Sequence, residues 1–419
     1  MKQFGLNSAA AYAVMAGIVL SRFGDETMPT TYLFRPLWLL VVPALVVGLI
    51  ALVAKRNGPV VAVGLAAFGL HQFIGLAVIG IGLLLLGLRA LGRPLDVGRV
   101  AMLVSLLFLA IGVVRALPLV EIPGPGPTVA TQAGPPMYVI LLDGYARLDS
   151  LAEIGIDNRS FVEALERRGF THYGDATSET VWTEQTLTAV LTGKEVGPFD
   201  EASPVGLKRE LRRQWDLPDG FVALDPQIGH VNIPGVPHVG SDAVNDFEAN
   251  LIMGSSVGRI APEPIRRWLA DDVLAHHLRT LDILASAEHR RVFAHLVAPH
   301  PPFVFGDDET AECWPVCHLW AGQIERTGIS LDNWVAAFDR QLAGLNPLLL
   351  ETVDSIIARE PDAVIVLFSD HGARYTEAMV DTEWHRIFLV ARTPGHDDLF
   401  ADAPHPRFIL TRLMQTYED

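Results

Sequence analysis

The longest uncharged apolar stretch of this chain spans residues 59–88. Residues 59–88 contain no Asp, Glu, Lys or Arg. About 20 apolar residues are enough to cross the hydrocarbon core of a bilayer, so this stretch predicts a membrane segment. Three other apolar stretches, at residues 8–20, 37–54 and 100–119, lie on either side of it. We therefore expect residues 1–120 to form a transmembrane region and the protein to bind the lipid bilayer.

The number of spans depends on how residues 59–88 fold. One tilted helix gives four spans, whereas a break near residues 69–72 gives two short helices and five spans. Positive residues favour the cytoplasmic side of a membrane. Five spans alone place all the basic groups on that side, namely Lys2, Lys55-Arg56 and the cluster Arg89, Arg93 and Arg99. We therefore predict a multi-pass protein of the cell membrane with residues 120–419 outside the cytoplasm.

Charge is distributed unevenly along the chain. Residues 1–130 hold 9 Lys and Arg against 4 Asp and Glu, and the remainder holds 23 against 44. So acidic a domain is not expected to bind nucleic acid, although it can attract divalent cations. Residues 121–136 are rich in Pro and Gly and predict an extended linker between the membrane region and the domain of residues 137–419.

The two cysteines, Cys313 and Cys317, have a spacing that fits neither a redox dithiol nor a zinc knuckle. In an oxidising compartment they could close a small disulfide loop, and in the cytosol they would be ordinary thiols. The predicted position outside the cytoplasm favours the disulfide.

Two apolar strands in the domain end in carboxylates followed by glycine. Residues 364–369 have the pattern of a buried strand and lead into Asp370, His371 and Gly372. Residues 137–142 repeat this pattern and lead into Asp143 and a glycine. Ligands bind at the carboxyl ends of strands in open α/β sheets, and divalent ions accept carboxylate and imidazole ligands. Asp143, Asp370 and His371 are therefore candidate metal ligands.

Two more candidates lie between these strands. Residues 184–191 have helical spacing, which puts the hydroxyl of Thr183 at the helix N-cap, near the positive end of the helix dipole. A plain Thr cap is the alternative interpretation. A third strand, residues 292–297, leads into His300, which has prolines on both sides. Such a fixed imidazole could bind an oxyanion or protonate a leaving group, or it could be structural.

Strands and helices alternate through residues 137–419, which predicts an α/β domain with a mainly parallel sheet flanked by helices. The order of the candidate residues resembles the alkaline phosphatase superfamily in its sulfatase-like branch. It is most similar to membrane-anchored members such as lipoteichoic-acid synthases and phosphoethanolamine transferases. The motifs that carry the resemblance are Ser369-Asp370-His371-Gly372, Leu191-Thr192-Gly193, Leu142-Asp143-Gly144 and His300-Pro-Pro-Phe303.

The resemblance implies roles for these residues. Thr183, ten positions before Gly193, matches the family's nucleophile and would also ligate the metal with Asp143, Asp370 and His371. His300 matches a substrate-side histidine, and His385 matches a further one. The resemblance implies a divalent cation, Zn, Mn, Mg or Ca. One ion is expected rather than two, since the additional Asp of two-metal members has no counterpart here.

The function that follows is that of a metal-dependent phosphodiesterase or phosphoryl transferase. Its expected substrate is an envelope phosphate ester linked to a lipid or a glycan. Sulfatases need Cys or Ser at the position that Thr183 occupies, so sulfate-ester hydrolysis is the weaker alternative. An inactive domain that binds the envelope is a third alternative, and it would tolerate loss of Thr183, whereas catalysis would not.

Overall fold

The structure is a computed structural model that describes residues 2–23, 31–70, 97–116, 134–197, 205–306 and 324–418. It leaves short gaps at 225, 229–230, 234–235, 237, 240–242, 256–261 and 287. Cys313, Cys317, most of the predicted linker and residues 71–96, which decide between four and five spans, lie outside the described residues. The chain divides into two compact units, residues 1–122 with 245–265, and residues 123–244 with 266–419.

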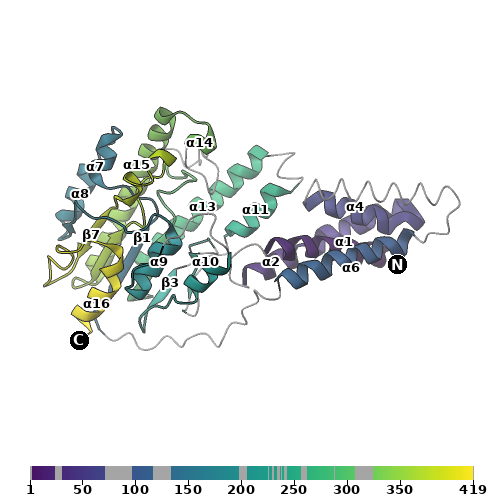
Figure 1. The fold of residues 1–419 in the computed structure, drawn as a ribbon, viewed down its shortest axis with the longest axis horizontal. Coiled ribbons are helices and arrows are strands. Elements are labelled where there is room, and N and C mark those ends of the chain that lie inside the picture. The colour runs from purple at the N-terminus through teal and green to yellow at the C-terminus, as the bar shows by residue number, and fades with distance from the viewer. Residues whose placement is uncertain are drawn as a thin grey trace. The chain divides into compact units, whose positions relative to one another are not determined.

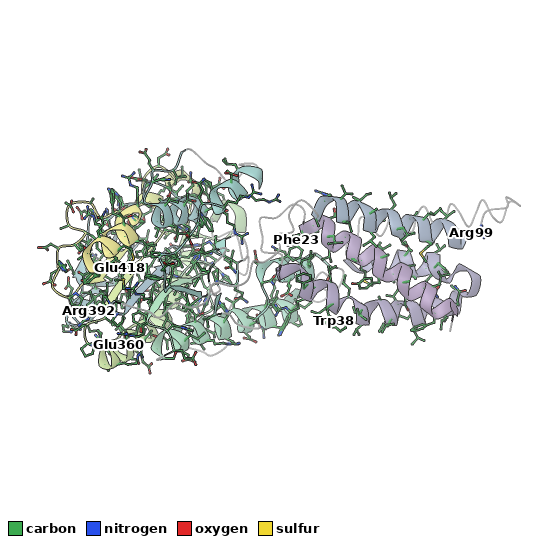
Figure 2. The ribbon with its side chains drawn as sticks, turned by 90° about the horizontal axis from the view of Figure 1, so that it is seen from below. Phe23, Trp38, Arg99, Glu360, Arg392 and Glu418 are labelled. Carbon is green, nitrogen blue, oxygen red and sulfur yellow. The ribbon has the colours of Figure 1, made fainter. Side chains whose placement is uncertain are left out.

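The first unit is built from apolar helices (Figure 1). Among the described residues, three segments are long and apolar enough to cross a membrane: Gln3–Phe23, Leu33–Ala54 and Arg99–Ala116. The helices are α1 (Lys2–Phe23), α2 (Thr31–Leu39), α3 (Val41–Ile50), α4 (Gly58–Leu70) and α6 (Val97–Ala116), with the 3-10 turn η1 (Ala51–Asn57). Apolar side chains also stand on the outside of this unit, and Trp38 is 74% exposed (Figure 2). Such a surface is expected where helices contact lipid rather than water.

A short helix from the middle of the domain sequence belongs to this first unit. Helix α11 (Asp246–Gly254) begins with a capping box between Asn245 and Glu248. The ring of Phe247 packs edge-on against Phe23 of α1, with the ring centroids 5.7 Å apart. Glu248 also pairs with Arg35 of α2. Helix α11 therefore packs with the apolar helices, although it lies within the segment 137–419 that the sequence assigns to one domain.

The second unit is organised by a seven-stranded sheet in the order β2-β7-β6-β1-β5-β3-β4. The strands are β1 (Met137–Leu142), β2 (Thr171–His172), β3 (Val222–Leu224), β4 (His238–Val239), β5 (Arg291–Leu296), β6 (Val364–Phe368) and β7 (Leu389–Arg392). Neighbouring strands from β6 to β4 are parallel, and β7 is antiparallel to both β6 and β2. The predicted mainly parallel sheet is confirmed.

Helices cover both faces of the sheet (Figure 1). The side chains of each strand alternate between these two faces and therefore pack in two separate cores. Tyr138, Ile140 and Leu142 of β1 pack in one core with α7 (Leu148–Glu153), α8 (Arg159–Glu166), α13 (Pro262–Ala285) and α15 (Leu331–Arg359). Met137, Val139 and Leu141 pack in the other core with α9 (Thr183–Thr192) and α16 (Ile409–Tyr417). The remaining elements are α10 (Val205–Arg212), α14 (Ile324–Thr327), η4 (Glu377–Met379), η5 (Glu383–His385) and η6 (Pro406–Phe408).

Candidate metal centre and nucleophile

The centre of the sheet brings the two predicted carboxylates together. β1 lies between β5 and β6 and is parallel to both, with Leu141 opposite Phe368 and Leu142 opposite Leu296. Continuing the β1–β6 register by two residues puts Asp143 level with Asp370. Both side chains therefore lie at the carboxyl edge of the sheet, where parallel α/β sheets bind their ligands.

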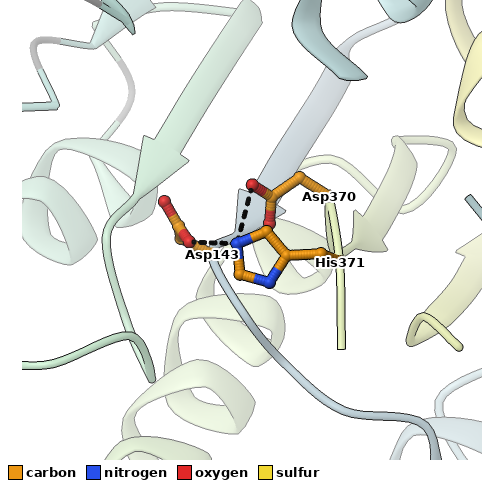
Figure 3. Close-up of side chains that lie close together, drawn as sticks. All are labelled: Asp143, Asp370 and His371. Carbon is orange, nitrogen blue, oxygen red and sulfur yellow. Dashed lines mark ion pairs between the residues drawn. The ribbon is translucent and has the colours of Figure 1, made fainter. Parts of the chain in front are cut away.

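Asp143, Asp370 and His371 form a buried group that could hold a metal ion (Figure 3). His371 Nε2 lies 3.3 Å from Asp143 Oδ1 and 3.3 Å from Asp370 Oδ2. The exposed fraction is 4% for Asp143, zero for Asp370 and 1% for His371. Buried carboxylates this close to each other need a compensating positive charge.

The orientation of the His371 ring suits a metal ligand. His371 Nδ1 lies 2.7 Å from the carbonyl oxygen of Gly372. A carbonyl oxygen only accepts, so Nδ1 carries a proton, and in the neutral ring Nε2 presents a lone pair. His371 Nε2 and Asp143 Oδ1 are buried without a hydrogen-bond partner. Electron pairs of an imidazole and two carboxylates thus converge, which suits a divalent cation.

Glycines permit the sharp turns that follow both strands. Gly144 has φ +71°, a backbone conformation that side chains rarely allow. Its backbone N–H donates to Asp370 Oδ1 over 3.1 Å and so joins the two turns. At Gly372, a Cβ would lie 2.3 Å from the carbonyl oxygen of Glu383. A residue with a side chain would therefore displace the turn that carries Asp370 and His371.

Thr183 lies beside this group. It is the first residue of α9, and Trp182 is the N-cap, so the helix begins one residue earlier than predicted and Thr183 is not the cap. Because its hydroxyl caps nothing, it is free to face Asp370, and Oγ1 donates to Asp370 Oδ2 over 2.7 Å. Thr183 is half-buried, whereas Asp370 is fully buried. The hydroxyl therefore stands at the more open side of the carboxylate group.

A second threonine of α9 fixes the backbone of Asp370. Thr186 Oγ1 donates to the carbonyl oxygen of Asp370 over 3.1 Å. Thr180 Oγ1 lies 2.7 Å from Thr186 Oγ1 and extends the network toward the loop before α9. Helix α9 thus holds Asp370 at two points, through its side chain and through its carbonyl oxygen.

His300 follows β5 and lies at the same edge. Its backbone N–H donates to the carbonyl oxygen of Asp143 over 2.9 Å, and its ring centroid is 6.3 Å from that of His371. Burial lowers the pKa of His300, and the positive charge of Arg374 acts in the same direction, while Asp143 opposes it. Nδ1 lies 2.7 Å from the carbonyl oxygen of Pro301 and therefore carries the proton of the neutral ring. Nε2 then suits accepting a proton better than protonating a leaving group.

His385 is not brought into the metal-binding group. It ends the 3-10 turn η5, and its Nδ1 lies 2.7 Å from the carbonyl oxygen of Ser178. Among the described residues, Asp143, Asp370 and His371 are the group of His, Cys, Asp and Glu close enough to share one ion. His385 instead connects the loop after β6 to the loop before α9.

One residue of the site, His295 of β5, was not predicted from the sequence. Its Nε2 lies 3.0 Å from Asp143 Oδ2, the carboxylate oxygen that faces away from His371. Burial alone would raise the pKa of Asp143, but His300, His295 and His371 outweigh burial and hold that pKa well below its usual range. Asp143 is thus ionised and oriented by β5. A histidine within an apolar strand was the available signal, because such a position is unfavourable unless the ring has a partner.

Comparison with solved structures finds chains of low sequence identity. The lipooligosaccharide phosphoethanolamine transferase A of Neisseria meningitidis is 13% identical, with 86% of this chain and 68% of that chain covered and a TM-score of 0.37. The periplasmic domain of phosphoethanolamine transferase EptC from Campylobacter jejuni is 10% identical, with 68% and 89% covered and a TM-score of 0.40.

A phosphonate monoester hydrolase of Agrobacterium radiobacter is 14% identical, with 67% of this chain and 73% of that chain covered and a TM-score of 0.37. No family model matches the sequence, and the search of curated proteins finds no relative.

Proposed function

We propose that this protein is a membrane-anchored, metal-dependent phosphodiesterase or phosphoryl transferase with Thr183 as its nucleophile. Asp370 Oδ2 accepts a hydrogen bond from Thr183 Oγ1 over 2.7 Å and lies 3.3 Å from His371 Nε2. A hydroxyl is thus held against a buried group of metal-ligand type, which is the arrangement that an activated nucleophile needs.

Asp143, Asp370 and His371 are the residues that would hold one divalent cation. Zn, Mn, Mg and Ca all remain candidates, because two carboxylates and one imidazole do not select strongly among them. The cation would supply positive charge that favours loss of a nearby hydroxyl proton and offsets charge on a phosphoryl group. His295 would keep Asp143 oriented toward it.

The protein's own residues account for the first half of the reaction. Thr183 Oγ1 attacks the phosphorus of a phosphate ester, and an Oγ1–P bond forms as the bond from phosphorus to the leaving oxygen breaks. The bonding electrons leave with that oxygen. The hydroxyl proton is directed at Asp370 Oδ2, which is placed to receive it. The product of this half is a phosphoryl group esterified to Thr183.

The second half returns Thr183 to its free form. The lone pair of His300 Nε2 takes a proton from an incoming hydroxyl, whose oxygen then bonds to phosphorus as the Oγ1–P bond breaks. Thr183 Oγ1 recovers its proton from Asp370 Oδ2. Water as the acceptor gives hydrolysis, and an alcohol gives transfer. The proton on His300 then passes to the oxygen that left in the first half.

The apolar helices restrict the substrates that the catalytic domain can reach. Three described helices are long and apolar enough to span a bilayer, and the charge pattern favours a catalytic domain outside the cytoplasm. A domain tethered in this way meets substrates that are themselves held at the membrane. We therefore assign a lipid- or glycan-linked phosphate ester of the envelope as the substrate class.

The test is an assay of the purified full-length chain in detergent. Bis-p-nitrophenyl phosphate, p-nitrophenyl phosphate and p-nitrophenyl sulfate are each offered with Zn, Mn, Mg or Ca. The proposal predicts metal-dependent cleavage of a phosphate ester that is lost in Thr183→Ala. Cleavage of the sulfate ester that survives Thr183→Ala would contradict the nucleophile. Absence of both turnover and metal binding would favour an inactive envelope-binding domain.

A further inference from the structure

An arginine and two tryptophans form a cluster beside Thr183. The Arg374 guanidinium carbon lies 4.9 Å from the ring centroid of Trp182 and 5.5 Å from that of Trp384. The two rings are nearly perpendicular, at 88°, with their centroids 6.0 Å apart. Cation–π contacts of this kind attract a guanidinium and restrict its orientation. Arg374 is therefore held in one place on two aromatic surfaces.

Both tryptophans of the cluster are held in place by the elements that contain them. Trp384 is buried, and its Nε1–H donates to the carbonyl oxygen of Thr376 over 3.0 Å. The carbonyl oxygen of Trp384 accepts from the backbone N–H of Gly372 over 2.9 Å. Trp182 is half-buried and is the N-cap of α9. Trp182 thus directly precedes Thr183 in the sequence, and Trp384 is hydrogen-bonded to the turn that carries His371.

Arg374 lies close to the start of α9. It is three residues after His371 in the sequence, and the ring that it contacts, Trp182, directly precedes Thr183. The guanidinium therefore lies beside the segment that carries Thr183.

A phosphoryl group bound at this site would need a positive charge in addition to the cation. Asp143 and Asp370 together carry two negative charges, which one divalent cation only balances. A phosphodiester brings one negative charge, and a phosphate monoester brings up to two. A guanidinium presents two parallel N–H donors that match two oxygens of a phosphoryl group, and it keeps its charge at every relevant pH.

We propose that Arg374, oriented by Trp182 and Trp384, binds the non-reacting oxygens of the phosphoryl group that Thr183 attacks. The inference deepens the function proposed above and rests on it. Arg374 is then a substrate-binding residue, and the two tryptophans are positioning residues that act through it.

The experiment measures inorganic phosphate binding to the metal-loaded, full-length protein in detergent, by calorimetry and by inhibition of bis-p-nitrophenyl phosphate cleavage. Arg374→Gln removes the charge, and Arg374→Lys keeps the charge without the planar fork. Arg168→Gln is the matched control, because that arginine pairs with Asp354 and not with the site. Thermal unfolding and metal affinity are measured for every variant.

Arg374→Gln is expected to weaken phosphate binding about 10- to 100-fold, the usual effect of losing charge-assisted hydrogen bonds. Arg374→Lys should lie between Arg374→Gln and the wild type, and Arg168→Gln should match the wild type. Metal affinity should be unchanged in all three. If Arg374→Gln does not fold, Trp182→Leu is the second variant, and weaker phosphate binding with unchanged metal affinity is again expected.

Phosphate affinity within twofold of wild type in Arg374→Gln would overturn the inference, as would an equal loss of metal affinity. Failure of the proposed function is distinguishable from both. If the wild type cleaves phosphate esters and Arg374→Gln keeps its phosphate affinity, only this inference fails. If the wild type cleaves none but its phosphate binding depends on Arg374, the anion site stands and the proposed reaction fails.

Discussion

His295 Nε2 lies 3.0 Å from Asp143 Oδ2 and holds the carboxylate oxygen that faces away from His371. His295 belongs to β5 and Asp143 follows β1, and these two strands are parallel neighbours. Both residues are almost fully buried. The other oxygen, Asp143 Oδ1, has no hydrogen-bond partner in the described structure and is left for a cation.

His295→Phe is therefore expected to weaken metal binding about 10- to 100-fold, the usual effect of losing a partner that orients a ligand. His295→Gln keeps an N–H donor at nearly the same position and should retain most of the affinity. Metal titration of both variants by calorimetry tests this. His396→Phe is the control, because His396 is exposed and contacts Tyr417. Equal affinity in His295→Phe and His396→Phe would contradict the assigned role.

Asp370→Asn should reduce metal affinity and lower phosphodiester turnover by at least about 100-fold, because the amide lacks the charge that the cation and Thr183 both use. Asp354→Asn is the matched control, since Asp354 forms a surface ion pair with Arg168. Turnover is measured at saturating metal, which separates weak metal binding from lost chemistry. Full recovery of the Asp370→Asn rate at high metal would show that Asp370 acts only through metal affinity.

Gly372→Ala should destabilise the turn that carries the site. The added Cβ would lie 2.3 Å from the carbonyl oxygen of Glu383 and 2.8 Å from that of Arg386, and backbone atoms cannot move aside freely. Overpacking of this kind costs about 1–3 kcal/mol. Gly306→Ala meets no atom within 4 Å and is the control. The unfolding temperature and the metal affinity should both fall in Gly372→Ala, and neither should fall in Gly306→Ala.

Glu383 makes stability depend on pH. Burial raises the pKa of Glu383 to about 7, because the partly compensating contacts of Ser150 and Arg386 do not offset desolvation. A carboxyl group whose pKa is raised in the folded state favours folding when it is protonated. That contribution is complete below the unfolded pKa of about 4.3 and is lost as the pH rises to about 7.

Glu383→Gln replaces the carboxyl group with an uncharged amide, so the variant does not lose stability through ionisation at this position. Its unfolding temperature at pH 8 should be a few degrees higher than that of the wild type. The difference should shrink toward pH 5, where the native carboxyl is protonated. Unfolding curves at pH 5 and pH 8 provide the measurement. A variant that is less stable than wild type at pH 8 would contradict the raised pKa.

The strand ends could be predicted from the sequence because β1 and β6 are buried on both faces and therefore read as uninterrupted apolar runs. Their polar termini, Asp143 and Asp370, stand out against that background. Thr183 was predicted one position from its place in α9, because capping depends on backbone angles that the residue types do not reveal.

Other parts of the site depend on tertiary contacts that no local pattern contains. His295 meets Asp143 through the register of β5 on β1, across 152 residues of sequence. Arg374 meets Trp182 only because the loop after β6 lies against the start of α9. Helix α11 is too short to show a clear apolar period, and its packing against Phe23 follows from the fold of the first unit.

The covalent bond between Thr183 and phosphorus can be trapped. The full-length, metal-loaded protein is mixed with bis-p-nitrophenyl phosphate, quenched within the first turnover, digested and examined by mass spectrometry. We expect a phosphoryl adduct on the peptide that contains Thr183, and none in Thr183→Ala. Turnover in the wild type with the adduct on another residue, or continued turnover in Thr183→Ala, would show that Thr183 is not the nucleophile.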